Sequence, residues 1–308
     1  MKTPPTWFLV DSGPNPSTDF FVAPHLASMG GEVVNCLWSD TPPVDAPTPG
    51  TNLVFVRYVT SSWLQWVRRH RQLLNRVVYF MDDDLFDRKA WAGQRWRYQW
   101  RLYQKAHKHK VALEACMTEL WVSSPVMAEK YRHLPVTLVA PQSPYLECES
   151  DQAPDTGNQH NPILFYHGSA SHEADLIWLH DVFKAVLTEH PTVVVELVAD
   201  QRLRRHYTDL KKAFKDRLNL VSPMPWPDYK KFITNPGRTI GLAPLLPVPF
   251  NKARAPTKVF DIHAAGAKGL YAESPVYASM VAKSQTDQLV PMRKEAWIET
   301  VLALLPRL

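Results

Sequence analysis

Short runs of apolar residues, mostly β-branched or aromatic, alternate along the chain with longer stretches whose apolar positions recur at helical spacing. These runs predict strands at residues 7–10, 32–37, 53–58, 77–81, 163–166, 193–198 and 240–243. Strands that alternate with helices are joined as βαβ units in parallel sheets. The pattern therefore predicts an α/β protein.

A polar, proline-rich stretch, residues 146–162, separates two groups of predicted strands. Pro, Ser, Asp, Gln and Asn dominate this stretch, which is typical of a linker between domains. We therefore predict an N-terminal domain over residues 1–145 and a second domain over residues 163–290. Each domain should contain one parallel sheet, with ligands bound at the carboxyl ends of the strands in a cleft that the two sheets face.

The last residues of the chain, 291–308, follow a different pattern. Trp297, Val301 and Leu304 fall on one face of a helix that begins behind Pro291. This spacing predicts a C-terminal amphipathic helix that packs on another part of the protein.

Composition and charge narrow the class of protein. Of the 308 residues, 45% are hydrophobic and 21% are charged, which excludes a disordered or collagen-like chain. Lys and Arg number 35 against 30 Asp and Glu, so the net charge of +5 favours anionic partners. Nucleic acids, lipid headgroups and nucleotide phosphates all fit this description.

The positions of the cysteines and the lengths of the apolar runs exclude several kinds of structure. Cys36, Cys116 and Cys148 lie far apart, so neither a disulfide framework nor a zinc site is expected. No apolar stretch reaches the roughly 18 residues that a membrane-spanning helix needs. The sequence thus predicts a cytoplasmic protein that is soluble or lies on a membrane surface.

Three consecutive carboxylates, Asp82, Asp83 and Asp84, follow the predicted strand at residues 77–81. Like charges this close repel unless a cation, a substrate hydroxyl or a proton offsets them. Because sites form at strand ends in α/β folds, we predict a catalytic role for these carboxylates. One alternative is the N-terminal cap of a helix. Another is an Asp-x-Asp site for Mg²⁺ or Mn²⁺.

Residues 88–110 interleave basic and aromatic side chains and contain no acidic residue. Such a segment suits a lipid headgroup interface or stacked nucleic-acid bases. Arg95 and Trp96 are our candidates for contact with an acceptor or a membrane. The alternative is a helix whose aromatic side chains face the core while its cations are merely solvated.

A strand, a turn of small residues and a helix start follow one another over residues 163–176. Gly168 and Ser169 allow the backbone to approach a ligand closely, and amides at a helix N-terminus can receive a phosphate. His172 lies in the first turn of the predicted helix. In the alternative interpretation Ser171 caps the helix and His172 is solvated.

Another strand, at residues 240–243, leads into a polar loop with Asn251, Lys252 and Arg254. A helix should begin near Thr257, and it would place two charged residues, Lys258 and Asp261, one turn apart on the same face. This arrangement combines a cation for phosphate with an acceptor for hydroxyl groups. The alternative is a surface ion pair, worth under ~1 kcal/mol.

These segments resemble the GT-B-fold glycosyltransferases, and specifically the large retaining family of bacterial nucleotide-sugar-dependent enzymes. Residues 256–266 are similar to the family's Pro-Ser-Lys-x-x-Glu-Tyr-x-Ala-x-Gly segment, and residues 166–176 to its Gly-x-x-x-His-x-x-Asp-Leu segment. Residues 77–86 resemble a strand with an Asp-Asp-x-Leu-Phe turn. The family's first acidic residue is replaced by Ala253, and its glycine-rich first turn by residues 11–18.

The resemblance implies two Rossmann-like domains that face a cleft, and it implies roles for single residues. Lys258 would bind the donor diphosphate and Asp261, in place of the usual Glu, the ribose hydroxyls. Gly168 and Ser169 would bring amides to the phosphates. The donor-binding candidates are Gly168, Ser169, His172, Asn251, Lys252, Arg254, Thr257, Lys258 and Asp261. Asp83 or Asp84 would lie beside the reacting sugar, with Ser17 and Thr18 on the acceptor side.

The function implied by the resemblance is transfer of a sugar from a nucleotide sugar to a glycan or lipid-linked acceptor, in bacterial surface polysaccharide or lipopolysaccharide synthesis. No cofactor and no metal ion are expected, and nucleic acid is not an expected partner. Peripheral contact with the inner face of the cytoplasmic membrane is compatible with this function. The alternatives are a non-catalytic, transferase-like binding subunit and a metal-dependent Asp-x-Asp transferase.

Overall fold

The structure is a computed structural model that describes residues 5–145, 161–168 and 170–305. The chain forms two compact units. The first unit comprises Met1–Pro144 and Val248–Ala255, and the second comprises Tyr145–Pro247 and Pro256–Leu308. Most of the linker predicted at residues 146–162 lies outside the described residues.

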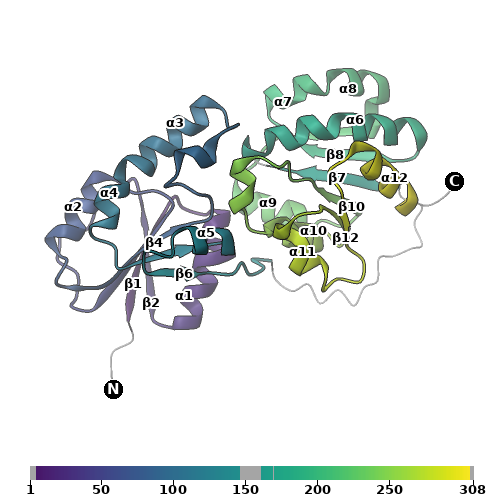
Figure 1. Ribbon diagram of the computed structural model, residues 1–308. Helices are drawn as coiled ribbons and strands as arrows, with labels where there is room; N and C mark the ends of the chain where they lie inside the picture. The colour runs from purple at the N-terminus through teal and green to yellow at the C-terminus, as the bar shows by residue number, and fades with distance from the viewer. Residues whose placement is uncertain (1–4, 146–160, 169, 306–308) are drawn as a thin grey trace. The chain divides into compact units, whose positions relative to one another are not determined.

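The first unit is built on a parallel sheet with strand order β2-β1-β3-β4-β5-β6. Its strands are β1 (Thr6–Asp11), β2 (Glu32–Leu37), β3 (Thr51–Val56), β4 (Leu74–Met81), β5 (Glu119–Val122) and β6 (Val136–Leu138). Its α-helices are α1 (Ala23–Met29), α2 (Ser61–Arg69), α3 (Trp96–Lys105), α4 (Lys110–Glu114) and α5 (Pro125–Lys130). Helix α1 covers one face of the sheet, and α2 and α4 cover the other (Figure 1).

The second unit contains a parallel sheet with strand order β12-β11-β10-β7-β8-β9. Its strands are β7 (Ile163–His167), β8 (Val194–Val198), β9 (Leu218–Val221), β10 (Arg238–Ala243), β11 (Lys268–Ala272) and β12 (Gln288–Val290). Its helices are α6 (Glu173–Glu189), α7 (Gln201–His206), α8 (Thr208–Phe214), α9 (Trp226–Ile233), α10 (Thr257–Ala264), α11 (Pro275–Val281) and α12 (Lys294–Leu304). Helices α6 to α8 and α12 lie on one face, and α9 to α11 on the other (Figure 1).

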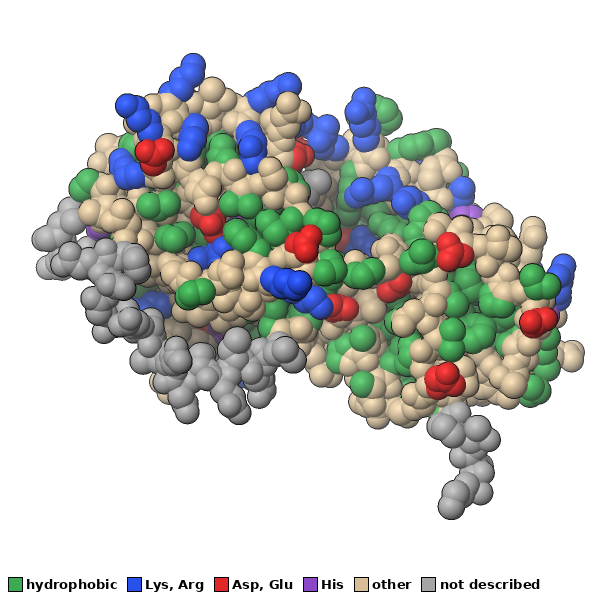
Figure 2. Space-filling view, turned by 180° about the vertical axis from the view of Figure 1, so that it is seen from behind, with side chains coloured by type: hydrophobic (Ala, Val, Ile, Leu, Met, Phe, Trp, Pro, Cys, Tyr) green, Lys and Arg blue, Asp and Glu red, His purple; other side chains and the backbone are tan. Residues whose placement is uncertain are grey.

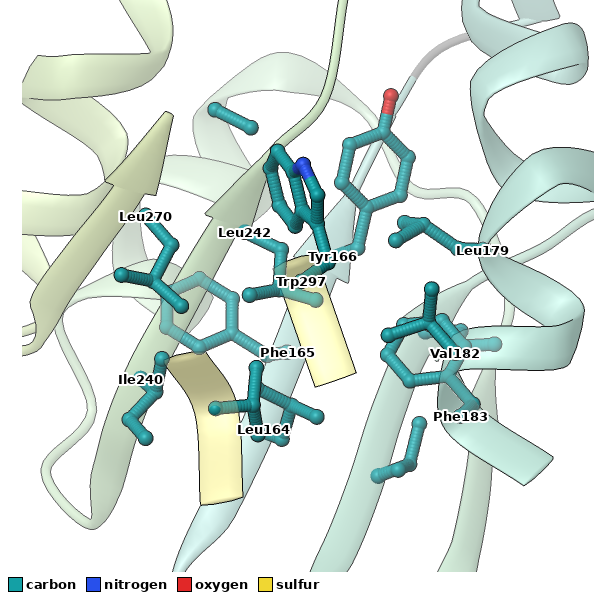
Figure 3. Packing of buried hydrophobic residues seen from close by; sticks show 14 of the residues in the cluster. Leu164, Phe165, Tyr166, Leu179, Val182, Phe183, Ile240, Leu242, Leu270 and Trp297 are labelled. Carbon is teal, nitrogen blue, oxygen red and sulfur yellow. The ribbon is translucent and has the colours of Figure 1, made fainter. Parts of the chain in front are cut away.

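The core of the second unit shows why its strands are almost continuously apolar. Side chains of β7 pack between the neighbouring strands and helix α6, and Trp297 of α12 closes the cluster (Figure 3). The ring of Trp297 meets Trp178 of α6 edge-on, with ring centroids 5.7 Å apart. A strand covered by helices on both faces needs apolar side chains on both, as parallel sheets do. The predicted C-terminal helix is thus confirmed, and it packs on α6.

Residues 248–255 differ from the predicted domain boundaries. They were expected in the second domain, but the structure places them in the first unit. The reason is apolar packing, because Phe250 and Ala253 are buried in the first unit's core. The chain therefore leaves the second unit after β10 and returns to it at α10.

A membrane-spanning element is absent from the part of the chain that is described. None of its helices combines the length and the apolar composition that crossing a bilayer requires.

Candidate functional site

Each sheet has one point at which the strand order reverses. In the first unit this point lies between β1 and β3, and in the second between β7 and β10. In open α/β sheets, ligands bind outside the carboxyl ends of the strands at such a point. The residues at these ends are Asp11 and Arg57 in the first unit, and His167 and Ala243 in the second.

Two of the three predicted catalytic carboxylates are brought together by an arginine. Arg57 follows β3, and Asp82 and Asp83 follow the adjacent strand β4. The guanidinium donates through Nη1 to the carboxylate of Asp82 and through Nη2 to Oδ2 of Asp83, at 2.9 Å in the second case. Burial by itself would lower the pKa of Arg57, but the charges of Asp82 and Asp83 raise that pKa well above its usual value. Arg57 is therefore a fixed cation at this strand end.

The third carboxylate, Asp84, points elsewhere. Its Oδ2 accepts from Lys130 Nζ at 2.6 Å, and its Oδ1 accepts from Tyr131 Oη at 2.5 Å. The Lys130 ammonium also bonds to Asp87 at 2.5 Å and lowers the pKa of that carboxyl. Asp84 thus ties the turn after β4 to helix α5, which is a structural role.

The predicted acceptor-side hydroxyls are engaged within the protein. Ser17 Oγ donates to Asp82 Oδ2 at 2.6 Å, and Thr18 Oγ1 donates to Asp11 Oδ2 at 2.6 Å. Both residues are buried, so their hydroxyls position the two carboxylates instead of facing solvent. Burial raises the pKa of Asp11, although hydrogen bonds from Thr18 and Gly13 oppose the effect.

Three predicted donor-binding residues, Asn251, Lys252 and Arg254, lie in the first unit with the rest of 248–255. The Arg254 guanidinium lies 4.8 Å from the centroid of the Phe250 ring. That ring meets Tyr98 of α3 edge-on at 5.9 Å. The pKa of Tyr98 is raised to about 12, chiefly by burial and also by the charge of Asp83, whereas Arg57 and Arg254 act in the opposite direction.

This placement corrects the prediction for the polar loop after β10. It was expected to serve the second domain, yet Phe250 anchors it in the apolar core of the first unit. Arg254 consequently belongs to the same electrostatic environment as Asp83, since both act on the Tyr98 phenol. The remaining acceptor-side candidates, Arg95 and Trp96, lie exposed at the start of α3.

In the second unit, Gly168 follows β7 directly. A Cβ atom there would lie 2.9 Å from the Tyr166 ring and 3.0 Å from Cβ of His172, so the position has no room for a side chain. His172 is buried and bonds through Nδ1 to Asp175 Oδ2 at 3.0 Å. The alternative interpretation, in which His172 is solvated, is therefore wrong. Ser169 lies outside the described residues.

The pair predicted from helical spacing forms as expected. Thr257 begins α10, and Lys258 Nζ donates to Asp261 Oδ2 at 2.9 Å. Asp261 is buried and its Oδ1 accepts from the Tyr145 phenol at 2.5 Å. The pair is thus no solvated surface ion pair, because one partner is withdrawn from water and holds a second hydrogen bond.

Behind this pair lies a buried polar network that sequence reasoning did not find. Arg238 Nε donates to Glu196 Oε1 at 2.7 Å, and His167 Nε2 lies 3.2 Å from the same oxygen. The Tyr229 phenol lies 3.4 Å from His167 Nδ1. Burial lowers the pKa of His167, which the neighbouring Glu196 only partly offsets. The network fixes the carboxyl ends of β7 and β8 beneath the candidate site.

Comparison with known proteins gives a clear result for the fold only. No protein-family model matches this sequence, and no curated protein sequence matches it either. Among solved structures, TarM of S. aureus, in complex with UDP, superposes with a TM-score of 0.55 at 6% identity, over 82% of this chain and 48% of TarM. A putative UDP-N-acetylglucosamine 2-epimerase from Listeria monocytogenes gives 0.54 at 9% identity, over 97% of this chain and 87% of its own.

The chain has the GT-B fold. A pneumococcal O-GlcNAc transferase, GtfA, solved with UDP and GlcNAc, extends the likeness with a TM-score of 0.54 at 12% identity over 83% of this chain. This chain spans about half of the length of TarM and GtfA, at 48% and 49%. The predicted fold class, two Rossmann-like units with parallel sheets, is confirmed.

Proposed function

We propose that this protein is a glycosyltransferase that moves a sugar from a nucleotide sugar to a glycan or lipid-linked acceptor in bacterial surface polysaccharide or lipopolysaccharide synthesis. The observation that carries the proposal is the Lys258–Asp261 pair at the start of α10, next to the strand-order reversal of the second sheet. A buried carboxylate with a lysine beside it suits a ribose and a diphosphate on one ligand. Structures of similar fold that were solved with UDP support this ligand class.

On the donor side, the chemistry needs stabilisation of the leaving group. When the bond between the anomeric carbon and the diphosphate breaks, negative charge grows on the phosphate oxygens. The Lys258 ammonium and the backbone amide at Gly168 are the groups that would stabilise this charge, without a metal ion. Asp261 would accept hydrogen bonds from the ribose hydroxyls. The donor roles proposed for Thr257 and His172 are then to shape the site, since His172 is buried.

On the acceptor side, we assign to Asp83 the role of the base that takes the proton of the acceptor hydroxyl group. Asp82 accepts hydrogen bonds from Arg57 and Ser17, Asp83 accepts one from Arg57, and Asp84 is bound to Lys130 and Tyr131. As the acceptor oxygen bonds to the anomeric carbon, its proton passes to the Asp83 carboxylate. The leaving nucleoside diphosphate carries the electron pair of the broken bond.

The proposal is tested by thermal unfolding against a panel of nucleoside diphosphates and nucleotide sugars, with and without Mn²⁺. Saturation at about 100 times the dissociation constant stabilises a protein by about 2.7 kcal/mol. We expect one nucleotide class to raise the melting temperature whether or not Mn²⁺ is present. This increase should be lost in Lys258→Ala and kept in Lys212→Ala, a control substitution at an exposed lysine. No shift with any nucleotide would contradict the proposal, and a shift only with Mn²⁺ would favour the Asp-x-Asp alternative.

The non-catalytic alternative has one observation in its favour. Ala253, where the resembled family has an acidic residue, is buried in the first unit's core, so no carboxylate replaces it there. A protein of this kind would bind a nucleotide sugar without releasing the nucleoside diphosphate. The retention of Lys258, Asp261 and the Asp82–Asp83 pair favours the enzyme.

We further propose that the outer face of α3 contacts an anionic membrane surface. Trp96 and Trp100 are 71% and 58% exposed, which is unusual for indole rings, and both lie among arginines. Arg97 stands 5.4 Å from the centroid of the Trp96 ring. Indole rings at headgroup depth with cations beside them suit a lipid interface.

A second basic surface offers a contrast. Lys and Arg side chains gather along the edge that α7 and α8 form in the second unit, among them Arg205 and Lys212 (Figure 2). The aromatic side chains of this edge, Tyr207 and Phe214, are buried and half-buried. The α7–α8 edge therefore has charge without an exposed ring to insert into a bilayer.

Sedimentation with vesicles separates these possibilities. Trp96→Ala/Trp100→Ala should reduce binding to vesicles that contain phosphatidylglycerol, whereas Arg205→Ala/Lys212→Ala should not. Equal binding by the tryptophan variant would refute the α3 assignment. Preference for single-stranded nucleic acid over vesicles, with affinity falling steeply as salt rises, would show a nucleic-acid surface instead.

A further inference from the structure

The end of β3 contains an arginine in a backbone conformation that arginine rarely adopts. Arg57 has a φ of 64°, in the left-handed region, and is one of two non-glycine residues with positive φ among those described. Its carbonyl accepts from the Tyr79 phenol at 2.6 Å, and its amide donates to the Phe80 carbonyl at 2.9 Å. Such a conformation costs free energy and persists where the surroundings fix it, commonly at functional sites.

This backbone conformation directs the side chain of Arg57 toward the end of the neighbouring strand. The guanidinium reaches across to the neighbouring strand end and divides its two ends between Asp82 and Asp83. The side chain of Arg57 is only 14% exposed, so this cation is held largely away from water. A planar guanidinium suits two separate carboxylate oxygens, which a lysine ammonium would meet as a single point charge.

An Asp-x-Asp metal site in this turn would use Asp82 and Asp84, and the arrangement of these two carboxylates does not fit one. Asp82 and Asp83 face Arg57, whereas Asp84 is turned to Lys130. Among the described residues, no three His, Cys, Asp or Glu side chains converge as ligands of one ion. A divalent cation at Asp82 and Asp83 would have to displace the guanidinium or lie beside it, against like-charge repulsion.

We propose that Arg57 is the built-in counter-cation of Asp82 and Asp83, so that this pair of carboxylates holds a guanidinium where it could otherwise hold a divalent metal ion. It acts as a positioning residue that holds both carboxylates together at the ends of β3 and β4. The inference concerns cation chemistry alone, so it can be tested without any nucleotide and stands or falls separately from the proposed function.

The test is Mn²⁺ binding by the full-length protein, followed by the paramagnetic resonance signal of free Mn²⁺. The Arg57→Ala substitution removes the guanidinium that pairs with both Asp82 and Asp83, and hard oxygen-loving ions bind adjacent carboxylates. We expect Arg57→Ala to bind Mn²⁺ at least about tenfold more tightly than wild type. Arg57→Lys, which keeps one positive charge, should bind no more tightly than wild type. The double variant Arg57→Ala/Asp83→Asn should lose the gained affinity.

Thermal unfolding covers the case in which Arg57→Ala is poorly folded. Mn²⁺ should then raise the melting temperature or refolding yield of Arg57→Ala and leave that of Arg57→Lys unchanged. An Arg57→Ala protein that neither binds Mn²⁺ nor is stabilised by it would overturn the proposal. Mn²⁺ binding by the wild-type protein that is lost in Asp83→Asn would overturn it as well.

Discussion

Phe250 gives the sharpest structural prediction, because its place in the sequence and its place in the fold disagree. It lies between β10 and α10, two elements of the second unit, yet its side chain is 2% exposed within the first unit's core. Phe250→Ala removes the ring that Tyr98 meets edge-on and that Arg254 covers. Truncating a buried phenylalanine costs about 3–5 kcal/mol. The first unit should therefore lose this amount of free energy of unfolding.

Hydrogen exchange followed by mass spectrometry measures this directly. In Phe250→Ala, the slowest amides of β3 and β4 should exchange through openings that are about 3–5 kcal/mol easier, while those of β7 and β8 keep their protection. Phe183→Ala, which truncates a fully buried ring on α6, is the matched control and should do the reverse. Loss of protection in β7 and β10 with β3 and β4 intact would refute the assignment of residues 248–255.

Three further predictions concern the second unit. Tyr145→Phe removes one donor to Asp261 Oδ1, while the hydrogen bond between Tyr229 and Asp261 remains. One acceptor position on Asp261 then opens for a ribose hydroxyl, so nucleotide affinity measured by calorimetry should rise roughly fivefold, the equivalent of one hydrogen bond of ~1 kcal/mol. A fall in affinity would contradict this. Arg238→Met leaves Glu196 without its guanidinium and should destabilise the second unit by about 3–5 kcal/mol in urea unfolding; an unchanged midpoint would refute it. Burial raises the pKa of Glu196, but His167 and Arg238 lower it, and the net effect is a lowered pKa in the folded protein. The ionised Glu196 should therefore stabilise the fold above about pH 4.3, its pKa in the unfolded chain. This stabilisation should be lost as the pH falls through the lower pKa of the folded protein. Urea midpoints from pH 7 to 3 should show this loss in wild type and less of it in the Arg238 variant.

The strands that the sequence predicts are those that its periodicity marks most strongly. β3 and β4 are buried on both faces, and their continuous apolar runs are visible without the structure. β3 ends at Val56 because Arg57 turns the backbone out of the strand. The strands that were not predicted, β5, β6, β9, β11 and β12, are only three to five residues long, and three of them, β5, β11 and β12, begin with a polar residue. Pairing with neighbours, and not local sequence, makes such segments strands.

The candidate site likewise contains one pair of residues that the sequence predicts and one set of contacts that it does not. Lys258 and Asp261 are one helical turn apart, so local spacing alone predicts that they meet, and they do. The partner of Asp82 and Asp83 is 25 or 26 residues earlier in the chain, on another strand. With 35 Lys and Arg in the sequence, no local pattern distinguishes Arg57 from a solvated cation. Only its position near the end of the strand predicted at residues 53–58 could have marked it.

The path of residues 248–255 was not predictable for a similar reason. The loop carries Asn251, Lys252 and Arg254, which read as a polar segment at the end of a strand. Its attachment to the first unit depends on a pocket for Phe250 that residues far away in the sequence create. Long-range apolar packing of this kind is decided by the assembled core.

A protein that transfers a sugar from a nucleotide sugar, as proposed here, must release a nucleoside diphosphate, and this release can be measured. Each nucleotide sugar is incubated with wild type, Lys258→Ala and Asp83→Asn, and the freed diphosphate is measured with and without candidate acceptors. We predict acceptor-stimulated release by wild type with one donor class, reduced roughly a hundredfold or more in Lys258→Ala. Asp83→Asn should still bind the donor but lose the stimulation. Tight donor binding without release of nucleoside diphosphate under any condition would contradict the proposed sugar transfer and show a binding subunit.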